Sequence, residues 1–279
     1  MGKLRVSLFA LLTACGSDAA KQTDAPPAQM DAPKQIDAKV FNDAPPVNYD
    51  LSCVGNAAPT TAPATINITG QITELAQSGQ NVAVNHPDGA KFDICDATGA
   101  DCAGANHIGT EQTTAGGGNY TFTDVPTTMG SKPLDVYLTM TNTNDRPTLI
   151  YPAEPITANL ANADGLTFPT ATFNQFAGFL GQTAGNGTAL VIVFDCTNKI
   201  LADNANLTIT VKQNGADVPN TTITDLGTLD ASGKGIYLVT NIPPGATAIG
   251  ATYKTMTLLG HTVKVAADTD TETIIRPGY

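Results

Sequence analysis

The clearest pattern in this chain is the alternation of apolar and polar residues over short segments. In the segment TINITGQIT (residues 65–73), Ile66, Ile68 and Ile72 fall on one face. The same period of two returns in four later segments, LDVYLTM (134–140), NLTITVK (206–212), HTVKVAA (261–267) and ETIIRP (272–277). Because successive side chains of a strand point to opposite faces, this pattern predicts half-buried strands of a β-sandwich. The one predicted helix is short and falls within ATFNQFAGFLG (171–181).

Two strand-like segments repeat each other. GNYTFTDVP begins at Gly118 and GIYLVTNIP begins at Gly235, an offset of 117 residues that holds along the whole match. The matched pairs that follow are Tyr120 with Tyr237, Phe122 with Val239, Val125 with Ile242, and Pro126 with Pro243. Upstream, GAKFDI at Gly89 parallels NANLTI at Asn204. The repeat predicts an all-β chain with two tandem sandwiches, residues 51–155 and 188–279, joined by a linker (156–187) that contains the short helix.

The repeat also predicts which side chains of the two matched strands are buried. Each strand should send its tyrosine and the next-but-one residue into a core, and the residue between them to the opposite face. The inward set is Tyr120, Phe122, Tyr237 and Val239. The outward pair is Thr121 and Leu238. Since an exposed leucine is unfavourable, we expect the helix near Phe176 and Phe179 to cover Leu238.

These motifs carry a family resemblance. A G/N-A-x-apolar-x-apolar strand, a turn, and then G-x-Y-x-apolar-x-x-apolar-P is similar to the carboxypeptidase regulatory-like domain. The second copy, LDASGKGIYLVTNIPPGATAIGAT (229–252), matches better than the first, in which the segment 86–114 is longer than the family pattern. The resemblance implies a seven-stranded, transthyretin-like (Ig-like) Greek-key sandwich. It also implies an accessory module without catalytic residues.

The N-terminus has the layout of an export signal. Lys3 and Arg5 precede the apolar run VSLFALL, which is shorter than the ~20 residues that a membrane-spanning helix needs. The tetrapeptide LTAC, ending at Cys15, resembles the bacterial lipobox. That resemblance implies that residues 1–14 are removed and that Cys15 is lipidated. By the same analogy, Gly16 favours the outer membrane. An ordinary signal peptide with a chance cysteine is the alternative.

Residues 15–50 differ in composition from the rest of the chain. Asp-Ala recurs every six or seven residues, prolines punctuate the stretch, and large apolar residues are almost absent. Such a segment cannot bury enough apolar surface to offset the entropy lost on ordering. We expect a disordered tether that spans roughly 100 Å when extended. It would hold the folded part away from the membrane.

Composition and charge exclude one class of partner. The chain has a net charge of -11, and only 14% of its residues are charged. An acidic chain has no electrostatic attraction for phosphates, so nucleic acid is not an expected partner. Thr, Gly, Asn, Val and Ile are abundant, which favours strands and turns over helices.

Four cysteines remain once Cys15 is assigned to the anchor. An exported protein meets an oxidising compartment, so an even number predicts disulfides, with three possible pairings. Cys95 and Cys102 flank the short tip DATGAD, and a staple between them is the simplest arrangement. That leaves Cys53 to pair with Cys196.

The segment 86–107 is the densest in polar residues. His86, Asp88 and His107, together with its other aspartates, are weak candidates for a calcium or zinc site. The alternative is that these side chains solvate a long hairpin and cap its turns, and we expect no metal and no cofactor. None of the three histidines belongs to a zinc-peptidase motif, and neither a nucleophile elbow nor a phosphate loop occurs.

Three classes of function follow from these observations. The first is a non-enzymatic, lipid-anchored envelope protein, on the periplasmic face or the cell surface, whose sandwiches bind a protein or glycan or act as spacers. The second is a carbohydrate-binding module, which usually needs exposed aromatic rings. Aromatic residues make up 6% of the chain and none is Trp. The third is a metal-dependent hydrolase that uses the 86–107 loop.

Overall fold

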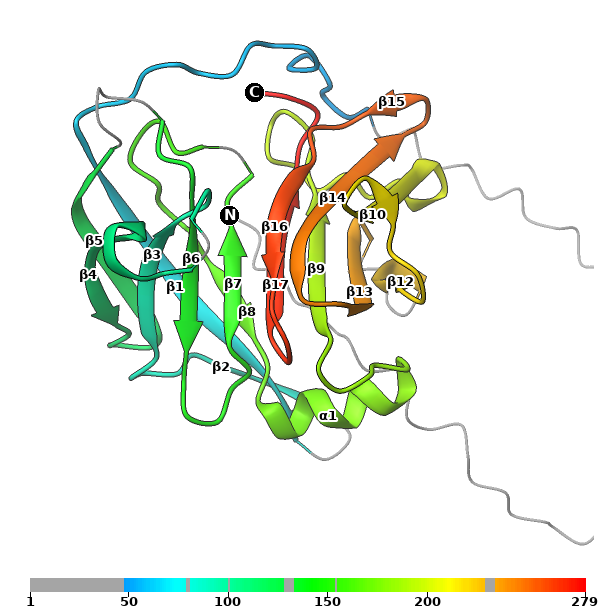
Figure 1. The fold of residues 1–279 in the computed structure, drawn as a ribbon, viewed down its shortest axis with the longest axis horizontal. Coiled ribbons are helices and arrows are strands. Elements are labelled where there is room, and N and C mark those ends of the chain that lie inside the picture. Colours follow the sequence, from blue (N-terminus) through cyan, green and yellow to red (C-terminus); the bar gives the residue numbers. More distant parts are fainter. Residues whose placement is uncertain (1–47, 79–80, 100, 128–132, 154, 229–233) are drawn as a thin grey trace, which may run out of the picture.

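The computed structural model describes residues 48–78, 81–99, 101–127, 133–153, 155–228 and 234–279 (Figure 1). The predicted signal peptide, Cys15 and nearly all of the predicted tether lie outside these residues. Within them the chain is built of strands, which confirms the all-β class. No helix of the described part is long and apolar enough to cross a membrane.

The strands divide between the two halves of the sequence. Those of the first half are β1 (Thr65–Ser78), β2 (Asn81–Asn85), β3 (Lys91–Asp96), β4 (His107–Thr113), β5 (Asn119–Pro126), β6 (Val136–Thr141), β7 (Thr148–Tyr151) and β8 (Gly165–Thr167). Those of the second half are β9 (Gly187–Val193), β10 (Leu207–Gln213), β11 (Ala216–Asp217), β12 (Thr222–Asp225), β13 (Ile236–Ile242), β14 (Gly245–Tyr253), β15 (Met256–Thr257), β16 (His261–Val265) and β17 (Asp270–Ile275). The helix α1 (Thr170–Phe179) lies between the halves, and the short 3-10 turns are η1 (Gly104–Asn106), η2 (Asn204–Asn206) and η3 (Leu226–Thr228).

One eight-stranded sheet runs through both halves, and we call it the shared sheet. Its strand order is β12-β13-β9-β17-β7-β6-β3-β4. The last strand of the chain, β17, joins the halves because it pairs in parallel with both β9 and β7. A second sheet, β2-β1-β5 with β8 on β1, completes the first sandwich. A third sheet, β11-β10-β14-β15 with β16 on β14, completes the second.

The two sandwiches repeat the same strand pairing. β1 pairs antiparallel with β5 and parallel with β8, just as β9 pairs antiparallel with β13 and parallel with β17. β3 pairs with β6 and β6 with β7, just as β10 pairs with β14 and β14 with β16. The sequence repeat therefore reflects a repeated topology.

The outer sheets of the two sandwiches cover opposite faces of the shared sheet. Alternation along β7 shows this, since Ile150 packs into the core of the first sandwich and both Leu149 and Tyr151 pack into the core of the second. The face of the first half that its own outer sheet does not cover is therefore turned toward the second sandwich. The strand β16 lies on this side, because its Val263 and Val265 pack into the second core; in Figure 1 it overlaps β17, beside β7.

The predicted burial of the repeat is confirmed. Tyr120, Phe122, Tyr237 and Val239 are all buried. Thr121 is exposed, and Leu238 is half-buried. Leu238 packs against a small cluster formed by Leu190, Leu226 and Ile236. The side chains of Phe176 and Phe179 lie outside the described part, so the expected contact with the helix stays a prediction.

The boundaries of the two sandwiches do not follow the order of the sequence. Residues 49–56, which we call the strap, lie against the second sandwich, although the sequence places them before the first. Tyr49 and Leu51 pack on the second core, and β17 serves both halves of the shared sheet. Hydrophobic alternation reports which faces of a strand are buried, but it does not say which neighbour buries them.

Candidate functional site

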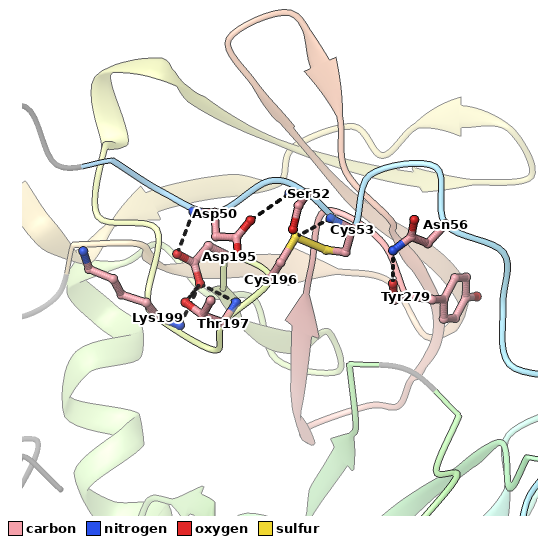
Figure 2. Close-up of a disulfide and its surroundings, with 9 residues drawn as sticks. All are labelled: Asp50, Ser52, Cys53, Asn56, Asp195, Cys196, Thr197, Lys199 and Tyr279. Carbon is pink, nitrogen blue, oxygen red and sulfur yellow. Dashed lines mark hydrogen bonds between the residues drawn. A yellow bond between two sulfur atoms is a disulfide. The ribbon is translucent and has the colours of Figure 1, made fainter.

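The strap is fastened where the tether enters the folded part. The disulfide between Cys53 and Cys196 joins it to the second sandwich, with a Cα–Cα distance of 5.8 Å (Figure 2). The Cys196 N–H donates to the Asp50 carbonyl over 2.8 Å. The Asp50 N–H in turn donates to Asp195 Oδ2 over 3.1 Å. The predicted pairing of Cys53 with Cys196 is confirmed.

Asp195 anchors the turn that carries Cys196. Its Oδ1 accepts hydrogen bonds from Thr197 N, Thr197 Oγ1 and Lys199 N at 2.8–3.0 Å. Burial alone would raise the pKa of Asp195, but the bonds from Lys199, Thr197 and Asp50 together hold it below its ordinary value. The carboxylate is therefore ionised at neutral pH and fixes both sides of the disulfide.

Aromatic and terminal contacts complete the strap. The rings of Tyr49 and Tyr253 meet edge to face with 6.1 Å between centroids. The Ala202 N–H donates to Tyr49 Oη over 3.0 Å. At the other end, Asn56 Nδ2 donates to the Tyr279 carbonyl over 3.1 Å (Figure 2). The strap thus has covalent, polar and aromatic attachments to one sandwich.

The second disulfide holds a loop over the open face of the first half. Cys95 and Cys102 are joined with a Cα–Cα distance of 5.0 Å, which confirms the predicted staple. Cys95 is fully buried, and Ala97 and Cys102 pack against the second core. We call residues 96–99 and 101–106 the stapled loop. It lies within the segment 86–114, in which the first copy is longer than the family pattern.

A groove of about 980 Å³ lies between the stapled loop and β16. One wall is formed by Ala97, Thr98 and Gly99, and the other by residues 259–267. Tyr151 of β7 also lines the groove, and Tyr279 connects it to the strap. Concave sites of this size between structural units are common places for ligands.

Asp135 is the acidic residue among the lining side chains. Burial raises the pKa of its carboxyl, nearby His261 lowers it, and the negative charge of Asp96 raises it further, with a net upward shift. On the opposite wall, the Lys264 N–H donates to Tyr151 Oη over 2.9 Å, which ties β16 to β7. This bond fixes β16 to the shared sheet beside the groove.

The residues predicted as weak metal candidates lie in separate places. His86 Nδ1 is 2.9 Å from the Ile72 carbonyl. Asp88 Oδ1 accepts from Gly117 N and Gly118 N, both at 2.9 Å, and these bonds lower the pKa of Asp88. In the described part of the chain, no three His, Cys, Asp or Glu side chains are grouped to hold a metal ion.

His107 lies on a different pair of strands. Its Nε2 is 2.8 Å from Asp93 Oδ1, which joins β4 to β3. The contacts of His86, Asp88 and His107 are those expected of residues that hold turns and strand pairs. The two repeat tyrosines, Tyr120 and Tyr237, are core residues and form no exposed platform for a sugar.

Sequence reasoning located neither the groove nor the strap. Both depend on contacts between residues more than a hundred positions apart, such as Tyr151 with Lys264 and Asp50 with Asp195. Periodicity within a segment carries no information on such pairs. The unusual length of residues 86–114 was the one available signal, because extra residues in one copy of a repeat often add a surface feature.

Comparisons with known proteins add limited information. No protein-family model matches the chain, and no curated protein matches it. Among solved structures, the shaft pilin SpaA of Lactobacillus rhamnosus GG is 12% identical, with 77% of this chain and 98% of that chain covered and a TM-score of 0.25. The minor pilin GBS52 of Streptococcus agalactiae is 10% identical, with 76% and 96% covered and a TM-score of 0.22. Likeness at this level does not establish a shared function.

Proposed function

We propose that this chain is a non-enzymatic envelope protein, anchored by lipid at Cys15, whose double sandwich serves as a binding or spacer module. The anchor rests on the sequence LTAC and the export-signal layout before it. Attachment to the outer membrane, on its periplasmic face or at the cell surface, is part of the same proposal.

The observation that carries the proposal is the strap. A long tether would leave a folded domain free to rotate about a single flexible link. Here the Cys53–Cys196 disulfide and the Asp50–Asp195 bond fix the exit of the tether to one sandwich. The shared sheet then joins that sandwich to the other through β17. This arrangement suits a rigid double sandwich that is attached to its tether at one fixed point.

The proposed relation to carboxypeptidase regulatory-like domains agrees with the repeated strand pairing of the two halves. An accessory role follows from it, since such modules have no catalytic residues of their own. A carbohydrate-binding role is the second candidate, but no exposed aromatic pair in the described residues favours it. A hydrolase that uses the 86–107 loop is the third, and the separate positions of His86 and His107 weigh against it.

The anchor is tested by changing its cysteine. We expect wild-type protein to enter the detergent phase of a phase-partition assay and to carry acyl chains by intact-mass analysis, since several chains make a firm anchor. Cys15→Ser should stay in the aqueous phase without acyl mass, while Ser17→Ala, a neighbouring control, should behave as wild type. A Cys15→Ser protein that still partitions with detergent would contradict the anchor.

A further inference from the structure

Two carboxyl groups meet at the end of the first sandwich where the helix α1 begins (Figure 1). Glu74 lies on β1, and Asp145 lies in the connection between β6 and β7. Burial raises the pKa of the Asp145 carboxyl, the hydrogen bond from Asn142 lowers it, and Glu74 raises it further through a hydrogen bond and through its charge. The carboxyl groups of Glu74 and Asp145 are therefore direct neighbours.

The strand register places a hydroxyl group between these two carboxyl groups. Thr167 of β8 lies opposite Glu74 of β1. On the other edge of β8, the Arg146 N–H donates to the Phe168 carbonyl, and Asp145 lies opposite Pro169. Opposed residues, and residues two positions apart in one strand, project from the same face. The side chains of Glu74, Thr167 and Asp145 therefore share one face, with Thr167 on the middle strand.

Two oxygen atoms of this group are buried without a hydrogen-bond partner in the described part of the structure. They are Asp145 Oδ1 and Thr167 Oγ1. Asp145 is 5% exposed and Thr167 is 0% exposed. The shared face is turned inward, because a Cβ atom at Gly165, two residues before Thr167, would meet the side chains of Ile72 and Ile150. Buried oxygens without a partner are costly, so these two atoms call for a ligand.

The described side chains bring no positive charge to the carboxyl pair. Arg146 follows Asp145 and projects to the opposite face, where its Nε donates to Asp270 Oδ1 over 3.0 Å. The ion pairs among the described residues include neither Glu74 nor Asp145. Asn85 Nδ2 donates to Glu74 Oε1 over 2.7 Å, but an amide carries no charge. Two adjacent carboxylates without a counter-ion repel each other, and a bound cation would remove that repulsion.

The donor atoms indicate which kind of cation fits. All of them are oxygens, from two carboxylates and one hydroxyl, and Ca²⁺ binds six to eight oxygen ligands at about 2.3–2.6 Å. Zinc sites in proteins are usually built from cysteine and histidine, which this group lacks. Glu74 is half-buried, so water can reach the pair and supply the remaining ligands. A site with two carboxylates also agrees with the absence of any larger group of acidic, His or Cys side chains in the described residues.

We propose that Glu74, Asp145 and Thr167 form a calcium site that joins β1 to the connection between β6 and β7. The two carboxylates balance the charge of the cation, and the Thr167 hydroxyl and water complete its coordination. Because the site has few charged ligands, its dissociation constant should be about 0.1–1 mM, as in extracellular calcium modules. The inference goes beyond the proposed function and does not depend on the lipid anchor.

The first test is thermal unfolding of the full chain in rising concentrations of CaCl2, with NaCl of equal ionic strength as the control. Ca²⁺ should raise the Tm once its concentration exceeds the dissociation constant, because a ligand that binds only the folded state stabilises it. MgCl2 should raise the Tm less, because Mg²⁺ demands near-octahedral geometry and dehydrates reluctantly. An equal rise in MgCl2 would overturn the assignment to calcium.

Variants locate the site by equilibrium dialysis with radioactive calcium. Glu74→Gln and Asp145→Asn should each weaken Ca²⁺ binding at least tenfold, whereas Glu111→Gln, at an exposed carboxyl of β4, should bind as the wild type does. Glu74→Gln is measurable even if Asp145→Asn folds poorly, since Glu74 is half-buried and glutamine keeps an oxygen acceptor for Asn85.

Thr167→Val separates binding from structure. It preserves the shape of the side chain and removes a hydroxyl that has no partner. Ca²⁺ binding should weaken severalfold, while the Tm without Ca²⁺ should stay the same or rise. A merely structural role of this hydroxyl would instead lower the Tm without Ca²⁺ and leave the affinity unchanged.

Three outcomes would overturn the calcium site. The first is a Tm that responds equally to CaCl2 and NaCl, and the second is an unchanged Ca²⁺ affinity in Glu74→Gln. The third is an absence of any Ca²⁺ effect together with a higher Tm of Glu74→Gln at neutral pH, which would mean that the two carboxyl groups share a proton instead. None of these results changes the partition of the Cys15→Ser protein, so failure of the site and failure of the anchor are distinguishable.

Discussion

The tyrosines of the two sandwiches occupy equivalent positions but have different hydroxyl environments. Both rings are buried in strands that match over nine residues. The Tyr120 hydroxyl donates a hydrogen bond to the Ala163 carbonyl. The Tyr237 hydroxyl is buried without a partner in the described part of the structure. Burial raises the pKa of both phenols, so each stays protonated at neutral pH.

The residue across the strand pair explains the difference. Tyr120 lies opposite Gly70, and Tyr237 lies opposite Val191. A Cβ atom at Gly70 would come within 2.2 Å of the Ala163 oxygen and 2.7 Å of Tyr120 Oη. The glycine therefore leaves the space in which this hydrogen bond forms, whereas Val191 fills the corresponding position with a buried side chain. The two copies share strand pairing and burial, but the hydrogen bonding of the buried tyrosine hydroxyl differs between them.

At the glycines that precede the matched strands, by contrast, the backbone conformation and its hydrogen bond are the same in both copies. Gly118 and Gly235 both have positive φ, at 74° and 79°. Asp88 Oδ1 accepts from Gly118 N, and Asn204 Oδ1 accepts from Gly235 N. In each sandwich, a side chain that precedes the upstream strand thus caps the turn. The hydrogen bond that caps the turn is therefore present in both copies, whereas the hydrogen bond of the tyrosine hydroxyl is present in only one.

The largest expected difference between the sandwiches concerns their disulfides. Cys53 and Cys196 are 143 residues apart, and Cys95 and Cys102 are 7 apart. In the chain-entropy model, removing the long bridge should cost about 5 kcal/mol and the short one about 2.5 kcal/mol. Paired alanine variants of each bridge, compared by urea unfolding, measure both. Equal losses would mean that local packing, rather than loop closure, sets the contribution of each bridge.

Truncation of the matched tyrosines tests whether the two cores are equivalent. Tyr120→Ala and Tyr237→Ala should each lower the free energy of unfolding by about 3–5 kcal/mol, because each empties a large buried site. Thr121→Ala, at an exposed position of the same strand as Tyr120, should change it by less than about 0.5 kcal/mol. If one tyrosine variant unfolds like the wild type, the matched strands do not have equivalent cores.

Much of this fold follows from local pattern, and the rest depends on long-range pairing. Alternation predicts the strand at 206–212, and the observed strand β10 covers Leu207–Gln213. The repeat predicts the burial of Tyr120 and Tyr237. The cysteine spacing predicts both bridges, because one staple leaves a single remaining pair. Each of these predictions uses the pattern of residues within short segments or the number of cysteines.

The joining of the two sandwiches could not be predicted in this way. The apolar run at Ile274 and Ile275 indicates a buried strand, but not that β17 lies between β7 and β9. For the same reason the sequence does not predict the groove beside β16, although the extra length of residues 86–114 indicates that this copy carries an added feature. Strand order depends on which strand edges pair with each other, and this pairing produces no periodic pattern in the sequence.

Ionisation of a buried acid on β17 tests how strongly this strand joins the sandwiches. Glu272 accepts a hydrogen bond from Leu166 N over 2.8 Å. Burial raises the pKa of its carboxyl to about 8, against the lowering by the Leu166 bond. The stabilising protonated form is thus fully present below the ordinary pKa and is lost as pH rises toward 8. Between pH 6 and 8 the free energy of unfolding should fall by up to about 1.4 kcal/mol per pH unit.

The matched variant for that measurement is Glu272→Gln, which keeps an oxygen acceptor for Leu166 N and cannot ionise. It should abolish the decline between pH 6 and 8, while Glu111→Gln, at an exposed position of β4, should preserve it. Loss of stability should appear in both sandwiches, because β17 pairs with β7 and β9. A decline confined to one sandwich would show that the shared sheet does not couple them. An unchanged slope in Glu272→Gln would assign the pH dependence to another group.

Removal of the two hydroxyl groups is the most direct test of the comparison between the tyrosines. Tyr120→Phe removes the donor to the Ala163 carbonyl and should cost about 1–3 kcal/mol, since it leaves a buried acceptor unpaired. Tyr237→Phe removes a buried hydroxyl that has no partner, and it should leave the free energy of unfolding unchanged or raise it. Both variants keep the ring, so packing is the same in each pair. Urea unfolding at one pH below 7 separates the two outcomes from the ionisation of Glu272. Equal losses at the two positions would mean that Val191 does not block a partner for Tyr237, and the distinction drawn from Gly70 would fail.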